Sequence, residues 1–119
     1  MQESGEDLSK FAGLKLVPIY GAPVLILLSA PTDAPSSPVN TALAAENMLL
    51  EATGLGLGSC FLMSVTRALN GENSRDLARE AGVPEGYTVQ CAVIVGHAAA
   101  ENKFTAAERS KKGAVSYVD

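Results

Sequence analysis

An α+β domain, with a sheet flanked by helices, is the architecture that the apolar pattern of this chain predicts. Three short apolar runs, at residues 22–29, 59–63 and 87–95, have the length of buried strands. A stretch rich in Ala, Leu, Met and Glu at residues 40–53 separates the first two runs and favours a long helix. The length of 119 residues fits a single domain, residues 1–119.

The first strand and the long helix each carry local signals. The run at 22–29 is almost continuously apolar, which is typical of a strand buried on both faces, and Pro23 stands at its beginning. Ser37 is the candidate N-cap of the helix, and Pro38 follows at the first helical position, where its fixed φ is favourable. The two elements therefore have a loop at residues 30–37 between them.

The long helix is apolar on nearly all sides. Leu43 and Leu50 lie seven residues apart, and alanines, leucines and a methionine cover most of the other directions. Such a helix is packed by protein on both flanks, and 119 residues can hardly enclose it alone. We therefore expect an oligomer, in which the β-like segment 114–118 pairs with a second subunit by exchange.

A glycine-rich stretch, residues 54–58, ends the long helix and leads into the second strand. A phosphate-binding glycine loop has the opposite polarity, because it precedes a helix N-terminus. Two interpretations remain: a glycine C-cap that allows a tight turn, and a surface where a flat ligand lies against the backbone of Ser59 to Ser64. Further along, Ser74 is expected to cap a short helix over residues 75–81.

Composition excludes several classes of protein. The formal charge of −4 argues against nucleic-acid binding, although the cations near the C-terminus leave a local anion site possible. No apolar run is long enough to cross a membrane, and the acidic N-terminus does not resemble a signal peptide, so we expect a cytoplasmic protein. Cys60 and Cys91 lie in apolar segments and are expected to be reduced core residues.

Side chains that could carry out chemistry are few. One histidine and two separated cysteines do not make a metal site, and the carboxylates are scattered. His97 follows a strand and is interpreted as a surface or packing residue, and no base accompanies Cys60 or Ser59. We therefore expect no catalytic side chain: the chain either performs no chemistry or takes its chemistry from a cofactor.

Five segments in order resemble the C-terminal two-thirds of an FMN-dependent nitroreductase, over roughly residues 19–118. They are Tyr-Gly-Ala-Pro-Val-Leu-Ile at 20–26, Ala-Leu-Ala-Ala-Glu-Asn-Met-Leu-Leu-Glu-Ala at 42–52, Leu-Gly-Leu-Gly-Ser-Cys at 55–60, Val-Pro-Glu-Gly-Tyr at 83–87 and Ala-Val-Ile-Val-Gly at 92–96.

The resemblance implies an α+β fold with a mixed sheet flanked by helices, in an intertwined homodimer with exchanged C-terminal segments and FMN at the interface. It implies that electrons pass from NAD(P)H through FMN to a nitroaromatic, a quinone or a similar acceptor. It also implies that the isoalloxazine lies beside the turn and the strand that follows it, and that Arg109 or Lys111 pairs with the FMN phosphate. The residues implied beside the ring are Gly56, Gly58, Phe61, Leu62, Met63 and Ser64.

One departure from the family pattern leaves alternatives open. Residues 1–20 contain neither the Arg-Ser-x-Arg-like segment nor the Pro-Ser-x-x-Asn stretch with which family members bind much of the flavin. The chain is therefore expected to be a truncated form or fragment of such a domain. The alternative function is a flavin-free dimeric scaffold or small-ligand-binding module of the same fold.

Overall fold

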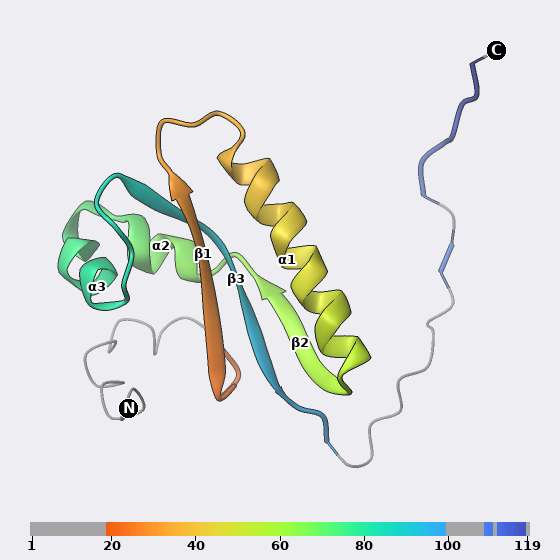
Figure 1. Cartoon of the computed structure of the whole chain (residues 1–119), viewed down its shortest axis with the longest axis horizontal. Helices are drawn as coiled ribbons and strands as arrows, with labels where there is room; N and C mark the ends of the chain where they lie inside the picture. The colour runs from red at the N-terminus through yellow and green to blue at the C-terminus, as the bar shows by residue number, and fades with distance from the viewer. Residues whose placement is uncertain (1–18, 100–108, 111, 119) are drawn as a thin grey trace.

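The computed structural model describes residues 19–99, 109–110 and 112–118 (Figure 1). Three strands and three α-helices follow one another in the order β1, α1, β2, α2, α3 and β3, with a 3₁₀ turn, η2, between α2 and α3. Their bounds are β1 Val24–Pro31, α1 Ser37–Gly54, β2 Leu57–Leu62, α2 Val65–Asn70, η2 Glu72–Ser74, α3 Arg75–Glu80 and β3 Tyr87–His97.

The last of the three described strands, β3, is the centre of the sheet. The strand order is β1-β3-β2, and both pairings are antiparallel. The mixed sheet that the resemblance implied is therefore not what the described residues form. Because β1 lies at an edge, most of its side chains are only partly covered and Leu28 alone is buried, which corrects the expectation of a strand buried on both faces.

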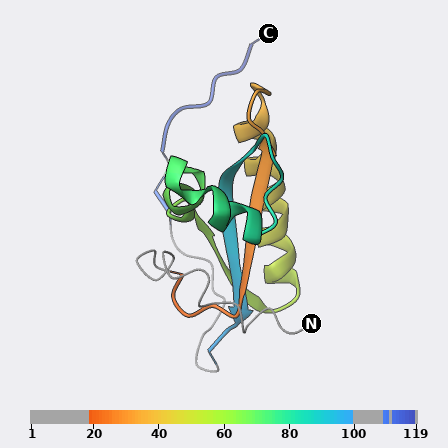
Figure 2. The same ribbon diagram turned by 90° about the vertical axis from the view of Figure 1, so that its left-hand side faces the viewer.

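Helices cover the two faces of the sheet, as the two views in Figures 1 and 2 show. On one face Ala45 of α1 forms a cluster of buried residues with Leu28, Cys91 and Val93 of the sheet. On the other face α2 and α3 cover a second cluster, Leu62, Val65, Leu69, Val89, Ala92 and Ile94. The sheet is therefore the middle of three layers, and its central strand contributes to both cores.

A β-bulge assigns the residues of β3 to these two faces. Leu28 is paired with Cys91 and Ser29 with Val89, so Gln90 is left without a partner on β1. Side chains of a strand normally alternate between faces, and the extra residue reverses that alternation. Val89 consequently joins the cluster under α2 and α3, although it is two residues from Cys91 on the α1 side.

The helices begin and end close to where the sequence predicts, with two exceptions. Ser36, not Ser37, is the N-cap of α1, and Ser37 is a buried first-turn residue whose hydroxyl donates to the carbonyl of Pro31 at 2.8 Å. Helix α2 was not predicted, because a six-residue helix starting Val-Thr has weak helix propensity and is stabilised by packing.

The C-terminal segment does not form the expected strand within the described residues. Residues 112–118 have no regular secondary structure, and they run apart from the sheet in Figure 1. Tyr117 and Val118 are 90% and 96% exposed. Exchange of this segment with a second subunit stays a prediction.

Candidate functional site

The turn between α1 and β2 requires glycine at one position. The N–H of Leu55 donates to the carbonyls of Glu51 and Ala52, and the N–H of Gly56 donates to Thr53 at 3.0 Å. Gly56 has a φ of +77°, and nothing lies within 4 Å of where its Cβ would stand. Its conformation, not lack of space, therefore selects glycine there, which confirms the C-cap interpretation of the stretch.

A pair of glycines stands where β2 begins and β3 ends. Gly58 is paired with Gly96, and Leu57 with His97. A Cβ on Gly96 would approach the Pro23 ring to 3.1 Å, whereas a Cβ on Gly58 would make only ordinary contacts, the nearest at 3.6 Å. The close packing of Pro23 thus explains why residue 96 is glycine. At Gly58 the backbone is not covered by a side chain of its own.

The strand β2 is an edge strand with almost no polar side chains. Among the described strands it pairs only with β3, so alternate N–H and C=O groups point away from that sheet. From Leu55 to Thr66 the sequence has no charged residue. Hydrogen bonding to a ligand along this edge would therefore come mainly from backbone groups, which supports the second interpretation of the glycine stretch.

The residues that the resemblance placed beside the ring lie along β2, with Gly56 and Gly58 at its beginning and Phe61 to Ser64 at and just beyond its end. Leu62 is buried under α2, while Phe61 and Met63 are 40% and 56% exposed. The carbonyl of Met63 accepts from the N–H and the hydroxyl of Thr66, the second residue of α2. Phe61 and Met63 therefore present apolar surface next to the outer edge of β2.

Ser64 is the one buried side chain with an unmet hydrogen bond among the described residues. It is the N-cap of α2, but its hydroxyl makes no capping bond, and its Oγ is buried without a partner. An unpaired buried hydroxyl costs about 1–3 kcal/mol, so such a group in a native structure calls for an explanation. A ligand that reaches this oxygen would satisfy it.

The two candidate phosphate-binding residues are not placed beside the turn. Arg109 is exposed, and no hydrogen bond or ion pair joins it to any other described residue. Lys111 lies outside the described residues. The role of either residue stays a prediction.

The structure adds two residues to the site and corrects one expectation. Cys60, predicted to be a core residue, is exposed, because its side chain faces the α2 side of the sheet at a point that α2 does not cover. His97 is exposed at the end of β3, opposite Leu57 and next to the glycine pair. Only the antiparallel return of β3 brings His97 there, and the sequence carried no signal for that register.

No set of metal ligands accompanies the site. Within the described ranges, no group of three or more His, Cys, Asp or Glu side chains could hold a metal ion. Nor is any helix in that part of the chain long and apolar enough to cross a membrane. The described cavity of about 530 Å³ is elsewhere, at the Tyr87 end of β3 and thus at the opposite end of that strand from the glycine pair.

Comparison with solved structures finds the same architecture in flavoproteins. A nitroreductase with bound FMN from Bacteroides fragilis superposes with a TM-score of 0.72 at 30% identity, over 84% of this chain and 53% of that one. A nitroreductase with bound FMN from Desulfitobacterium hafniense gives a TM-score of 0.70 at 27% identity, over 96% and 62%. An FMN-dependent nitroreductase from Clostridium difficile gives 0.55 at 30% identity, over 69% and 49%.

The chain therefore spans 49–62% of the length of these solved relatives. No curated protein matches it. The sequence model of the Nitroreductase family matches residues 2–97, which include the whole sheet, all the helices and the glycine turn. That match begins before the five resembling segments and ends before Arg109 and Lys111. Because the match covers most of the chain, this protein belongs to the nitroreductase family.

Proposed function

We propose that this protein is a flavin-dependent oxidoreductase that takes electrons from NAD(P)H and delivers them to a nitroaromatic, a quinone or a similar acceptor. The family supports this, since relatives of this fold at 27–30% identity hold FMN. Bound FMN would supply two-electron redox chemistry, which the side chains of the candidate site do not offer. The role of the chain would be to bind the ring, orient it and limit access to it.

The observation that carries the proposal is the neutral outer edge of β2, together with an unsatisfied buried hydroxyl two residues after the strand ends. Gly56 and Gly58 leave the backbone open at one end, and the Ser64 Oγ is a buried group without a partner at the other. Phe61 and Met63 are apolar and partly exposed next to that edge. A flat heteroaromatic ring with polar atoms along one side matches this combination of apolar surface and backbone hydrogen-bonding groups.

The phosphate of FMN requires a cation, and the neutral turn has none. At neutral pH a phosphate monoester carries about −1.5 to −2 charges, which an arginine fork binds by two parallel hydrogen bonds. Arg109 and Lys111 are the candidates, and Lys112 follows directly. We propose that one of the first two residues pairs with the phosphate.

The proposed function includes a second copy of the chain, which would cover the exposed apolar face of α1. The outward side of α1 carries Val39, Leu43 and Leu50, which are 61%, 64% and 61% exposed. Its inward side carries small residues, among them Thr41, Ala45 and Ala52. Burial of such an outward face by a partner is favourable at roughly 25 cal/mol per Å² of apolar surface. We propose a homodimer in which α1 lies at the interface.

FMN binding to the purified full chain tests the flavin proposal. FMN is expected to raise the melting temperature and to lose its free fluorescence when it is added. Replacement of Arg109 and Lys111 together by Ala should weaken binding about 10–100-fold, because a hydrogen bond to a charged group contributes about 1.5–3 kcal/mol. Arg67→Ala, on the exposed side of α2, is the control and should leave the affinity unchanged.

The same titration with Ser64→Ala examines the ring side of the site. Without ligand this variant should be as stable as the wild type or slightly more stable, because it removes an unpaired buried hydroxyl. It should nevertheless bind FMN about 5–10-fold more weakly, as expected for one lost hydrogen bond. A wild-type protein that is colourless and unaffected by FMN in both melting and fluorescence would contradict the proposal, and a retained dimer would then favour the flavin-free scaffold.

A further inference from the structure

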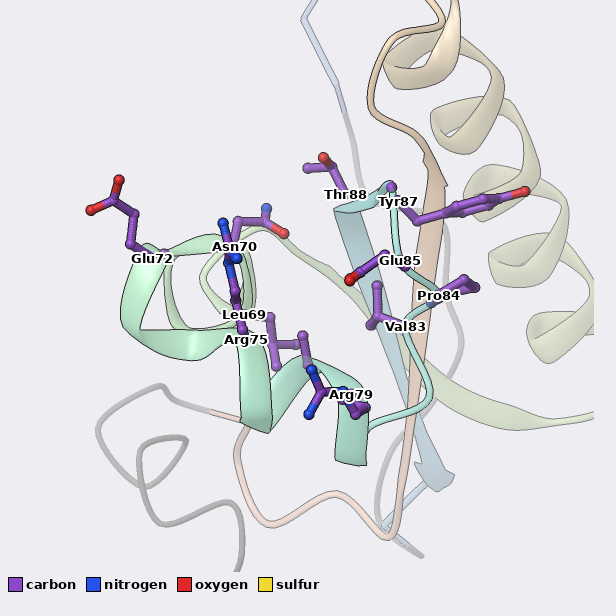
Figure 3. Close-up of a pocket in the computed structure, with 13 residues that line it drawn as sticks. Leu69, Asn70, Glu72, Arg75, Arg79, Val83, Pro84, Glu85, Tyr87 and Thr88 are labelled. Atoms are coloured by element: carbon purple, nitrogen blue, oxygen red, sulfur yellow. The ribbon is translucent and has the colours of Figure 1, made fainter.

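The described cavity lies between the helices α2 and α3 on one side and the turn leading into β3 on the other (Figure 3). Its volume of about 530 Å³ is within the range of small-molecule sites, roughly 300–1,000 Å³. The apolar part of the lining comes from both walls, with Leu69 and Ala78 from the helices and Val83 and Pro84 from the turn. This cavity is separate from the candidate flavin site, which is at the other end of β3.

Four charged side chains line the cavity, and two of them are already accounted for. Arg79 is 3.4 Å from the carboxylate of Asp76 in its own helix. Glu72 points away from the other lining residues in Figure 3. Arg75, on the helical wall, and Glu85, on the turn, remain. Within the described part of the chain neither makes an ion pair or a side-chain hydrogen bond.

Two polar side chains nearby, Asn70 and Thr88, are already hydrogen-bonded, and the ring of Tyr87 points away from the helical wall in Figure 3. The Asn70 amide donates to the carbonyl of Val89 and accepts from its N–H, at 2.8 and 3.0 Å. Thr88 is hydrogen-bonded to Thr32 at 2.6 Å. A ligand in the cavity would therefore meet one unpaired cation and one unpaired anion, on opposite walls, with apolar surface between them (Figure 3).

We infer that this cavity binds a free α-amino acid with a compact apolar side chain. The guanidinium of Arg75 would bind the carboxylate through its planar fork, and the carboxylate of Glu85 would accept from the ammonium group. The side chain would lie against Leu69 and Val83. A simple anion would satisfy Arg75 and leave Glu85 facing a like charge, so a zwitterion is the better complement.

Weak binding is expected, because both charged groups are exposed and solvent screens their attraction. A ligand of nine non-hydrogen atoms such as L-leucine should then bind with a dissociation constant of millimolar order. Backbone amide shifts in nitrogen-15 NMR spectra measure this range well. The experiment uses the full chain without FMN or NAD(P)H, so its outcome does not depend on the proposed redox function.

L-leucine is expected to shift the amides of residues 69–75 and 83–88 in a saturable way. The carboxylate-only analogue 4-methylpentanoate and the amine-only analogue 3-methylbutylamine should each bind at least about 10-fold more weakly, because each lacks one charged hydrogen bond. Arg75→Gln and Glu85→Gln should each weaken L-leucine binding by a similar factor. Two exposed residues outside the cavity provide controls of matched charge change, Arg67→Gln and Glu51→Gln, which should have no effect.

Three results would overturn the inference. The first is an absence of saturable shifts with L-leucine. The second is 4-methylpentanoate binding as tightly as L-leucine and indifferent to Glu85→Gln, since the cavity would then bind simple anions. The third is a control variant that weakens binding as much as Arg75→Gln, since general charge would then explain the effect. Arg75 and Glu85 are exposed, and a dispersed amide spectrum verifies that each variant is folded.

Discussion

Cys91 lies between the sheet and α1, where it is 2% exposed and packs in one cluster with Leu28, Ala45 and Val93. Burial raises the pKa of its thiol, because a thiolate loses hydration there, and the Thr41 side chain partly offsets that rise. Cys60 is exposed at the outer edge of β2. The two cysteines of the chain should therefore differ sharply in reactivity, since the thiolate is the reactive form.

A thiol reagent should modify Cys60 of the native protein quickly and Cys91 only after unfolding. Cys60→Ser should abolish the fast reaction, whereas Cys91→Ser should leave it in place. Two equally fast reactions in the native wild type would contradict this expectation. Mass spectrometry after brief alkylation, with and without urea, counts the modified thiols.

The raised pKa of Cys91 also predicts a pH dependence of stability. When a folded-state pKa exceeds the unfolded value, the stability it contributes is fully present below the unfolded value, which for a thiol is about 8.5. That contribution is lost as the pH rises through the folded value. The free energy of unfolding should thus fall more steeply in alkaline buffer for the wild type than for Cys91→Ala. Urea titrations at several pH values measure the two slopes.

Among the secondary structure elements, β3 pairs with both other strands, but one of its backbone positions is hydrogen-bonded by a side chain of α2. β2 ends at Leu62, opposite Ala92, so it does not reach Val89 on that edge of β3. The Asn70 side chain occupies the place instead and pairs with both the N–H and the C=O of Val89. Because Val89 is 1% exposed and sits beside the bulge, few alternative partners are available to its backbone. Asn70 therefore joins α2 to the sheet.

Asn70→Ala should lower the free energy of unfolding by about 2 kcal/mol, because it leaves two buried backbone groups without partners. Asn70→Asp keeps the acceptor and loses the donor, so its effect should be smaller. Asn73→Ala, an exposed position in η2 and away from the proposed α1 interface, is the control and should change stability by less than about 0.5 kcal/mol. Urea denaturation measures all three, and equal effects at positions 70 and 73 would exclude a role for the amide in holding β3.

At the scale of the whole molecule, periodicity and composition predict the elements better than they predict the arrangement. The three strands and the long helix lie within two or three residues of their expected positions, because apolar runs and helix-forming residues are local signals. The sheet order and the bulge at Gln90 depend on pairing between distant segments, which no local pattern encodes. The antiparallel pairing in place of a mixed sheet has the same origin.

The candidate site likewise has features that a local sequence pattern predicts and features that depend on long-range contacts. Gly56 could be recognised as a helix C-cap, because a positive φ after a helix is a local requirement. The exposure of Cys60 could not be recognised from the sequence, because it depends on how much of the sheet α2 covers. The pairing that sets His97 beside the glycines is likewise a long-range contact.

The outward face of α1 predicts that two chains assemble through this helix. Its fully buried residues are small and Met48 and Leu49 pack partly against the core, while Leu43 and Leu50 lie on the opposite side of a 3.6-residue turn and face solvent. Large apolar side chains gathered on one exposed helix face are typical of a surface that a partner covers. In a twofold interface each of these leucines would be buried in both copies.

Leu50→Glu should therefore separate the dimer, because it places two carboxylates in an apolar interface, where each charge loses hydration without gaining a partner. The dimer dissociation constant is expected to rise by at least about 100-fold, which corresponds to about 3 kcal/mol. Asn73→Glu, an exposed position in η2 on the other side of the sheet, adds the same charge and should leave the dimer intact. Sedimentation velocity over a range of concentrations separates the two species. A wild-type chain that sediments as a monomer throughout would contradict the interface, and the outward leucines of α1 would then need a different partner.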